Sequence, residues 1–222
     1  MVYEYGPTSS SLEEVLLALE DWLTRRYRLE YVPAHRRSAR QSRRLRRIRV
    51  WRRATARMID EVYRVRQQTI PRIEHETGYA FRSPETLPWI LINPSASRLF
   101  SGILAGFEEG ALPVRANDLA WLANTSTGIQ ALALIGDVTL RLKILPGRRV
   151  GSEELAALCD RWSLCENLIG GGNRRRQTGE TLEREKAALT LAVLGLIYTE
   201  GGDDALRPLV PLLNRLGAVL ST

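Results

Sequence analysis

The stretch LALIGDVTLRL, residues 132–142, places Gly136 and Asp137 in the middle of an otherwise apolar run. The apolar residues around this pair recur at helical spacing and predict a helix over about 127–144. A glycine costs a helix about 1 kcal/mol relative to alanine. A carboxylate is not buried without a partner. Both residues therefore need a structural or chemical role on this helix.

The same helical periodicity extends to both sides of this stretch. A capping box at Ser11–Glu14 starts the first run, and no segment shows the alternation of a strand. The sequence therefore predicts an all-α fold, in which Pro71 separates a basic helical N-terminal arm, 1–70, from a helical domain, 71–222. The other predicted helices cover about 11–31, 38–68, 118–124, 152–168, 181–199 and 203–220.

Composition narrows the class of protein. The 222 residues carry a formal net charge of +7, and 44% of them are hydrophobic. This content suffices for a packed core, and the positive charge favours a polyanionic partner, with nucleic acid ahead of an anionic membrane surface. Only two histidines, His35 and His75, are present. Histidine-based catalysis and a multi-histidine metal site are therefore not expected.

Cysteine usage and apolar runs indicate the compartment. Cys159 and Cys165 are six residues apart, which fits neither a disulfide framework nor a metal-ligand spacing. We interpret them as thiols of a reducing cytosol. The N-terminus is polar, and no apolar run reaches membrane-spanning length without a charge. The sequence thus predicts a cytoplasmic protein with no membrane partner.

The segment from Arg36 to Arg53 contains ten arginines and no acid. Like charges on one helix repel, and phosphates would supply the missing counter-charge. Arginine also binds phosphate in bidentate fashion and stacks on bases, which favours RNA. The alternatives are a plain solvated face, or a membrane-surface helix, for which the apolar stripe is too thin. The candidate RNA-binding residues here are Arg36, Arg37, Arg40, Arg43, Arg44, Arg46, Arg47, Arg49, Arg52 and Arg53.

A second basic segment, GGGNRRRQTG at 170–179, joins this list through Arg174, Arg175 and Arg176. Its glycines would let the backbone approach a phosphate. An ordinary flexible basic loop is the alternative interpretation.

Two further features are given structural roles: Gly195 is expected to permit a close helix crossing, and the tryptophans are expected in the core or an interface. These tryptophans are Trp51, Trp89, Trp121 and Trp162.

Three stretches, in order, carry a resemblance. GYAFRSPETLPWILINPSAS, LALIGDVTLRL and KAALTLAVLGLIYTEGG resemble the opening, the signature helix and the last catalytic helix of the ribonuclease III catalytic domain. The sequence lacks a double-stranded-RNA-binding domain, which is similar to the mini-ribonuclease III branch. The resemblance covers about 71–222. It implies a ribonuclease III-like helical fold, a valley for duplex RNA between two protomers, and a homodimer through the signature helix, Gln130–Leu142.

The family's activity requires Mg²⁺ held by carboxylates from two helices. Asp137 matches the signature aspartate and is the expected metal ligand, but the other acidic positions of the pattern are not acidic here. Glu166 and Glu185 are the candidates for relocated catalytic acids beside Asp137. The alternatives are that Asp137 caps a helix or pairs with an arginine of 174–176, and that Glu185 pairs within its own helix end. The positions that have lost their acids are Gln130, Ala133, Ala188 and Leu191.

Three functions remain open at this level. The first is a structured-RNA or double-stranded-RNA-binding homologue of ribonuclease III, catalytically degenerate, in RNA processing or ribosome assembly. The second is an active Mg²⁺-dependent duplex-RNA endonuclease with relocated acids. The third is a protein-interaction scaffold in a ribonucleoprotein. Mg²⁺ is expected only if the protein is catalytic. The insert at 101–126 is expected either to cover the RNA valley or to extend the dimer contact.

Overall fold

The computed structural model describes residues 11–31, 33–36, 38–148, 150–171 and 179–220, and it confirms the all-α prediction for them. No strand occurs in these ranges. The nearest approach to one is an isolated parallel bridge between Ile92 and Ile169.

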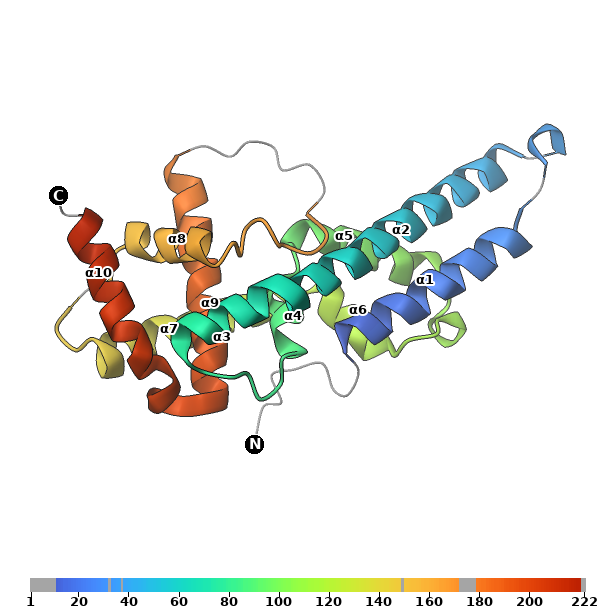
Figure 1. Ribbon diagram of the computed structural model, residues 1–222. Coiled ribbons are helices and arrows are strands. Elements are labelled where there is room, and N and C mark those ends of the chain that lie inside the picture. The colour runs from blue at the N-terminus through green and yellow to red at the C-terminus, as the bar shows by residue number, and fades with distance from the viewer. Residues whose placement is uncertain (1–10, 32, 37, 149, 172–178, 221–222) are drawn as a thin grey trace.

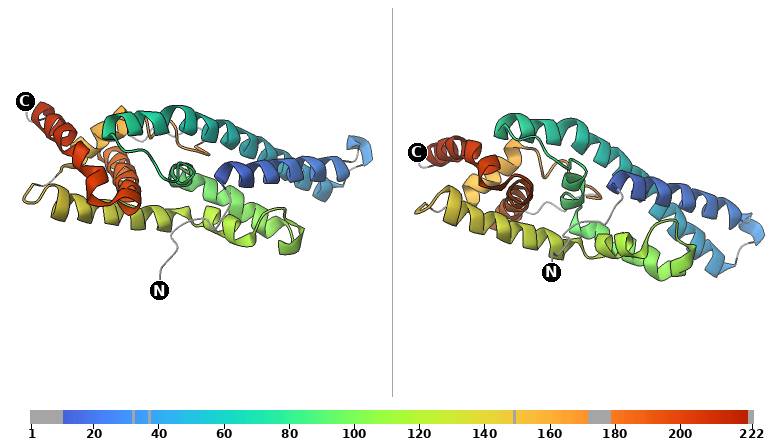
Figure 2. Two further views of the ribbon diagram at one scale, coloured as in Figure 1. Left: turned by 60° about the horizontal axis from the view of Figure 1, so that its bottom comes forward. Right: turned by 90° about the horizontal axis from the view of Figure 1, so that it is seen from below.

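The helices form an elongated molecule with two ends (Figure 1). The first two helices make a hairpin at one end, and α8, α9 and α10 gather at the other. The long second helix and α7 run along the molecule in separate layers. Near the C-terminal end α9 crosses between these layers, where it is seen end on (Figure 2). The bounds are α1 Leu12–Leu29, α2 Ala39–Arg64, α7 Thr125–Thr139, α8 Ser152–Arg161, α9 Glu180–Leu206 and α10 Val210–Leu220.

The expected break at Pro71 is not found. A π-helical turn, Val65–Thr69, joins α2 directly to α3, Ile70–Thr77. Pro71 lies in the first turn of α3, where a missing N–H is tolerated. The continuous helical segment made of α2, the π-helical turn and α3 ends only at Gly78, whose φ of 64° is the left-handed conformation that commonly terminates helices.

One hydrophobic core joins the residues on both sides of Pro71. It extends from Leu16 and Leu23 of α1, through Trp89 and Leu158, to Leu213 of α10. The capping box predicted for α1 is confirmed, since Glu14 N–H donates to the Ser11 hydroxyl and Ser11 N–H donates to the Glu14 carboxylate. The N-terminal arm is therefore packed against the rest of the chain.

The crossing of α7 and α9 explains Gly136. A Cβ atom at Gly136 would lie 2.1 Å from the Leu191 carbonyl oxygen, and one at Gly195 would lie 2.0 Å from the Leu132 carbonyl oxygen. Such distances are impossible for a methyl group, so only glycine lets these two backbones touch. The prediction that Gly195 permits a close crossing is confirmed, and Gly136 is its counterpart.

The remaining helices connect these two ends. The insert at 101–126 packs against the α1–α2 hairpin, where the Phe107 ring lies 4.5 Å from that of Trp22 and 5.9 Å from that of Trp51, centroid to centroid. The predicted core role of the tryptophans is confirmed: Trp89 and Trp162 are fully buried, and the other two are packed against the core. The connecting helices are α4 Thr86–Ile90, α5 Ser97–Gly106 and α6 Ala116–Ala123.

One predicted boundary is wrong, and one predicted break is found at a single residue. The helix predicted over 152–168 ends at Arg161, because Ser163 has a φ of 52° and turns the chain back on itself. The break predicted at 200–202 is found at Gly202, whose φ of 69° and ψ of −158° kink the chain between two helical segments of α9. A positive φ at a single residue is a feature that helical periodicity does not reveal.

Candidate nucleic-acid interface

The basic run folds as α2, a continuous helix with a two-sided charge distribution. Ser38 starts it with a capping box to Gln41, and no glycine or proline interrupts it. The narrow apolar stripe is buried at Leu45, Ile48, Met58 and Val62. The arginines therefore occupy the rest of the helix circumference.

The inward-leaning arginines are engaged by the neighbouring hairpin. The Arg44 Nε atom lies 2.7 Å from Glu30 Oε2 of α1. Arg49 donates to the Tyr27 hydroxyl, and this hydrogen bond raises the pKa of the Arg49 guanidinium. Arg52 also lies over the Tyr27 ring, 5.6 Å from its centroid. These arginines have a structural role in holding α1 against α2, in addition to their charge.

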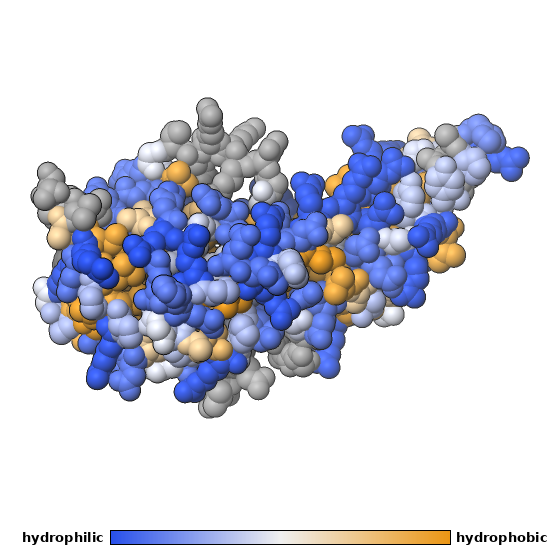
Figure 3. Space-filling model, viewed as in Figure 1, coloured by the Kyte–Doolittle hydropathy of each residue, from blue (hydrophilic) through white to orange (hydrophobic). Residues whose placement is uncertain are grey.

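The outward-facing arginines form a row that we call the α2 arginine face. Its members are separated by three, seven and four residues, which are whole numbers of helical turns to a close approximation, so they share one side of the helix over roughly 20 Å. All four side chains are exposed, and no carboxylate of the described chain pairs with them. Figure 3 shows a hydrophilic surface along α2. The members are Arg43, Arg46, Arg53 and Arg57.

Sequence reasoning missed Arg57. The acid-free run was closed at Arg53, although Arg57 follows four residues later on the same helical face. Of the other predicted residues, Arg40 is exposed near the start of α2, Arg47 lies over the Trp51 ring, and Arg36 is exposed in a short 3₁₀ turn. Helical spacing separates the arginines of the α2 arginine face from the other arginines of the run, whereas a count of charges along the sequence does not.

Four of the predicted RNA-binding residues lie outside the described residues, namely Arg37 before α2 and, in the 170–179 loop, Arg174, Arg175 and Arg176. The segment before that loop is nevertheless attached to α2, because the Gly170 N–H donates to Glu61 Oε2 at 2.6 Å. Gly170 is therefore attached to the helix that carries the α2 arginine face.

The candidate catalytic acids are not gathered into a metal site. Asp137 lies on α7, where its Oδ1 atom is 2.8 Å from Arg141 Nε, one turn along the same helix. Glu166 is exposed in the turn after α8, and Glu185 is exposed on the first turns of α9. Within the described ranges, no group of three or more histidine, cysteine, aspartate or glutamate side chains could hold a metal ion. The donor set therefore does not fit Mg²⁺, which needs several hard oxygen ligands.

The partners of these acids differ from those expected. Asp137 pairs with Arg141 on its own helix. At the start of α9, Arg184 pairs with Glu180, and Lys186 reaches Asp160 of α8 at 2.6 Å. The expected pairing of Glu185 with its immediate neighbours is therefore wrong, because residues adjacent in a helix point in different directions.

The α7–α9 crossing shows what α9 offers to Asp137. Gly136, the residue before Asp137, lies against the backbone of Leu191. Leu191 and Ala188 of α9 are apolar, so these two positions supply no carboxylate.

No protein-family model matches the chain, and comparisons with characterised proteins and with solved structures find no match either. A membrane-spanning helix is also not found among the described residues, since none is both long and apolar enough.

Proposed function

We propose that this protein binds structured RNA through the α2 arginine face. The observation that carries the proposal is the row of four exposed arginines that no carboxylate of the described chain neutralises. Each phosphate that such a row neutralises releases counterions, which makes association favourable and strongly dependent on salt. RNA processing or ribosome assembly is the setting in which a protein of this kind would act.

We also propose that the protein is a degenerate relative of ribonuclease III in which cleavage is lost or nearly lost. The three motifs of the resemblance fall on the segment 78–97, which contains α4, on α7 with its π-helical continuation, and on α9, and the all-α architecture agrees with that kinship. The apolar side chains that α9 offers at the crossing, and the Asp137–Arg141 pair, support the loss of cleavage. Active endonuclease chemistry would need acids that the described residues do not assemble.

The binding proposal is tested with the full chain and a short duplex RNA. The variant replaces Arg43, Arg46, Arg53 and Arg57 by glutamine. A matched control removes the same number of positive charges from other elements. Its members are Arg25, Arg184, Arg207 and Arg215, of which the first three pair with acids three or four residues earlier in the chain.

The salt dependence of binding is the decisive measurement. Four lost phosphate contacts lower the slope of log affinity against log salt by about three to four, since each contact contributes about 0.9 in duplex nucleic acid. The control variant is expected to change the slope by less than about one. If both variants bind alike, the proposal fails and a protein-interaction scaffold becomes the better interpretation.

Cleavage is tested separately, with duplex RNA and either Mg²⁺ or Mn²⁺. We expect the wild-type protein and Asp137→Ala to leave the RNA equally intact. Products that form with the wild-type protein and vanish with Asp137→Ala would show an active endonuclease and overturn the assignment of lost cleavage. Because this assay does not depend on the α2 arginine face, the two parts of the proposal are judged independently.

A homodimer through α7 is part of the proposal. Leu134, Val138 and Leu142 recur every four residues along α7 and its continuation, and their side chains are 64%, 44% and 72% exposed. An apolar stripe of this kind is costly in water and is covered when two copies pair. Light scattering tests it: Leu134→Glu with Leu142→Glu should convert a dimer into a monomer, whereas Leu17→Glu with Leu29→Glu on α1 should not. A wild-type monomer at all concentrations would contradict it.

A further inference from the structure

The fold brings the two cysteines into contact. Cys159 lies on the last turns of α8 and Cys165 lies in the turn that follows, and their Sγ atoms are 3.4 Å apart. Cys159 is fully buried and Cys165 is half-buried. A disulfide requires an S–S separation of about 2.05 Å, so the two sulfurs have to approach each other by only about 1.3 Å to be joined. Cys165 is the less buried member of the pair.

A turn of unusual geometry produces this contact. Ser163 has a φ of 52°, a conformation that side chains with a Cβ atom disfavour. The turn is closed by the Leu164 N–H, which donates to the Cys159 carbonyl at 3.0 Å. Without this reversal the helix would continue, and the two sulfurs, six residues apart, would point to different sides.

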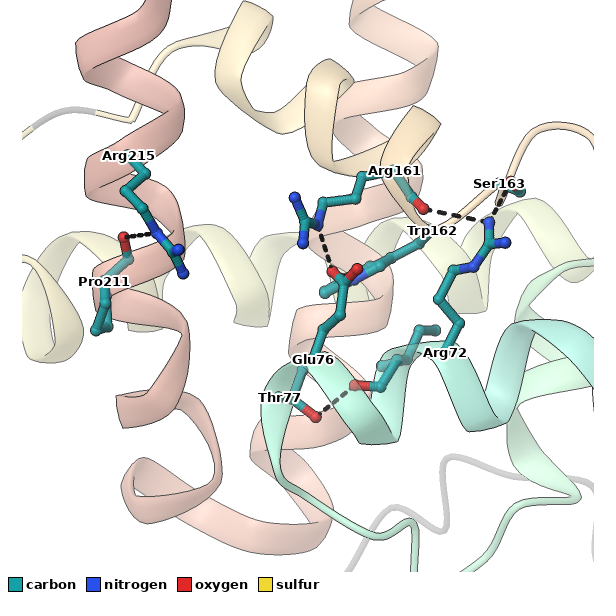
Figure 4. Close-up of polar contacts among 9 residues, drawn as sticks. Arg72, Glu76, Thr77, Arg161, Trp162, Ser163, Pro211 and Arg215 are labelled. Carbon is teal, nitrogen blue, oxygen red and sulfur yellow. Dashed lines mark hydrogen bonds and ion pairs between the residues drawn. The ribbon is translucent and has the colours of Figure 1, made fainter.

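Contacts from α3 hold the turn in place (Figure 4). Arg72 donates to the Ser163 hydroxyl at 2.7 Å. Glu76 accepts hydrogen bonds from Arg161 at 2.7 Å and from the Trp162 indole at 3.0 Å. The side chains before and within the turn are therefore fixed by a neighbouring helix, which keeps Cys165 over Cys159.

Burial and hydrogen bonding distinguish the two sulfurs. The hydrogen bond to Cys165, followed by burial, raises the pKa of the Cys159 thiol. Cys165 is less buried than Cys159, so a reagent in solution reaches its sulfur first.

We propose that Cys159 and Cys165 form a redox site, which a low-molecular-weight disulfide converts reversibly into an intramolecular disulfide. Cys165 gives its proton to water, and its thiolate attacks one sulfur of the reagent and releases a thiolate, which takes a proton from water. Cys159 then gives its proton to water and attacks the Cys165 sulfur, which releases the second thiolate, and this thiolate also takes a proton from water. Two protein thiols and one small disulfide thus become one protein disulfide and two small thiols.

Intact mass spectrometry of the full chain tests the site without any variant. The reduced protein is treated with oxidised glutathione and then with iodoacetamide. We expect a species lighter than the reduced protein by two hydrogens, with no alkylation, which dithiothreitol returns to two free thiols. Persistent free thiols, a stable adduct with glutathione, or a disulfide between two chains would each overturn the proposal.

Single-cysteine variants assign the order of the steps. Cys159→Ala should accumulate one glutathione adduct on Cys165, because the resolving sulfur is gone. Cys165→Ser should react far more slowly, because the remaining thiol is buried and protonated. Equal reaction of both variants would contradict the assigned roles, and circular dichroism of each variant controls for folding.

Discussion

The α2 arginine face and the α7–α9 crossing differ in whether their charged side chains have partners of opposite charge. On α2, four exposed arginines stand in a row without a carboxylate partner in the described chain. At the crossing, Asp137 has its partner one turn away, at 2.8 Å on the same helix. A charge that is already paired gains little from a further partner. In an unpaired row of like charges, by contrast, the mutual repulsion is reduced when a polyanion binds.

Close packing distinguishes the two regions as well. The crossing depends on two glycines whose backbones touch, so little can be changed there without disturbing the fold. The α2 arginine face borders solvent, so we expect it to tolerate substitution. The crossing is thus a structural element, while RNA binding on α2 is our proposal, and this comparison can be tested from its largest expected effect to its smallest.

The largest effect is expected at the crossing. Gly136→Ala should lower the free energy of unfolding by about 3 kcal/mol or more, because its methyl group would lie 2.1 Å from a backbone oxygen that no rotamer change can move. Urea denaturation measures the change. Gly110→Ala, with no atom within 4 Å of the added Cβ, is the control and should stay within about 0.5 kcal/mol of the wild type. Similar midpoints for both variants would contradict the close crossing.

A smaller effect is expected when the α2 arginine face keeps its charge. Replacing its four arginines by lysine should weaken RNA binding by only about three- to tenfold, because point charges remain while bidentate contacts are lost. The slope of log affinity against log salt should stay as in the wild type. A loss as large as that of the glutamine variant would show that recognition depends on guanidinium geometry more than on charge.

Asp137 is expected to contribute little to stability. Asp137→Asn should change the free energy of unfolding by about 0.5 kcal/mol or less, as for other exposed pairs one helical turn apart. Asp21→Asn, which breaks the comparable Asp21–Arg25 pair of α1, is the matched control. A much larger loss at Asp137 would show that the crossing depends on this charge and would weaken the comparison.

The smallest effect is expected at Glu200 of α9. Its Oε2 atom accepts the Tyr79 hydroxyl at 3.2 Å and the Arg82 N–H at 3.1 Å, while burial raises the pKa of its carboxyl group. Because the folded protein then binds the proton more tightly than the unfolded chain does, Glu200 stabilises least once the pH has risen through that raised pKa.

Glu200→Gln removes this titration and should change stability at neutral pH by less than about 0.5 kcal/mol. The wild type should lose stability relative to the variant as the pH rises through the acidic range. Thermal denaturation at a series of pH values measures the difference. An opposite slope would mean that hydrogen bonding to the carboxylate outweighs burial.

Local patterns in the sequence predicted most of the helices but fewer of their ends. The all-α class, the Ser11–Glu14 capping box and the basic helix follow from periodicity and capping chemistry, which act over a few residues. The break expected at Pro71 was wrong because the π-helical turn before it absorbs the proline. The end of α8 was missed because a left-handed serine is held by residues of a distant helix.

The same distinction between local pattern and tertiary packing applies to the candidate interface. The sequence by itself determined that α2 carries far more positive charge than it can neutralise, because charge and helical spacing are local properties. Only the tertiary structure decided which arginines face solvent, which acid pairs with which base, and that Cys159 meets Cys165. Those outcomes depend on the directions in which side chains far apart in the chain point once the core has packed, and no short-range pattern encodes them.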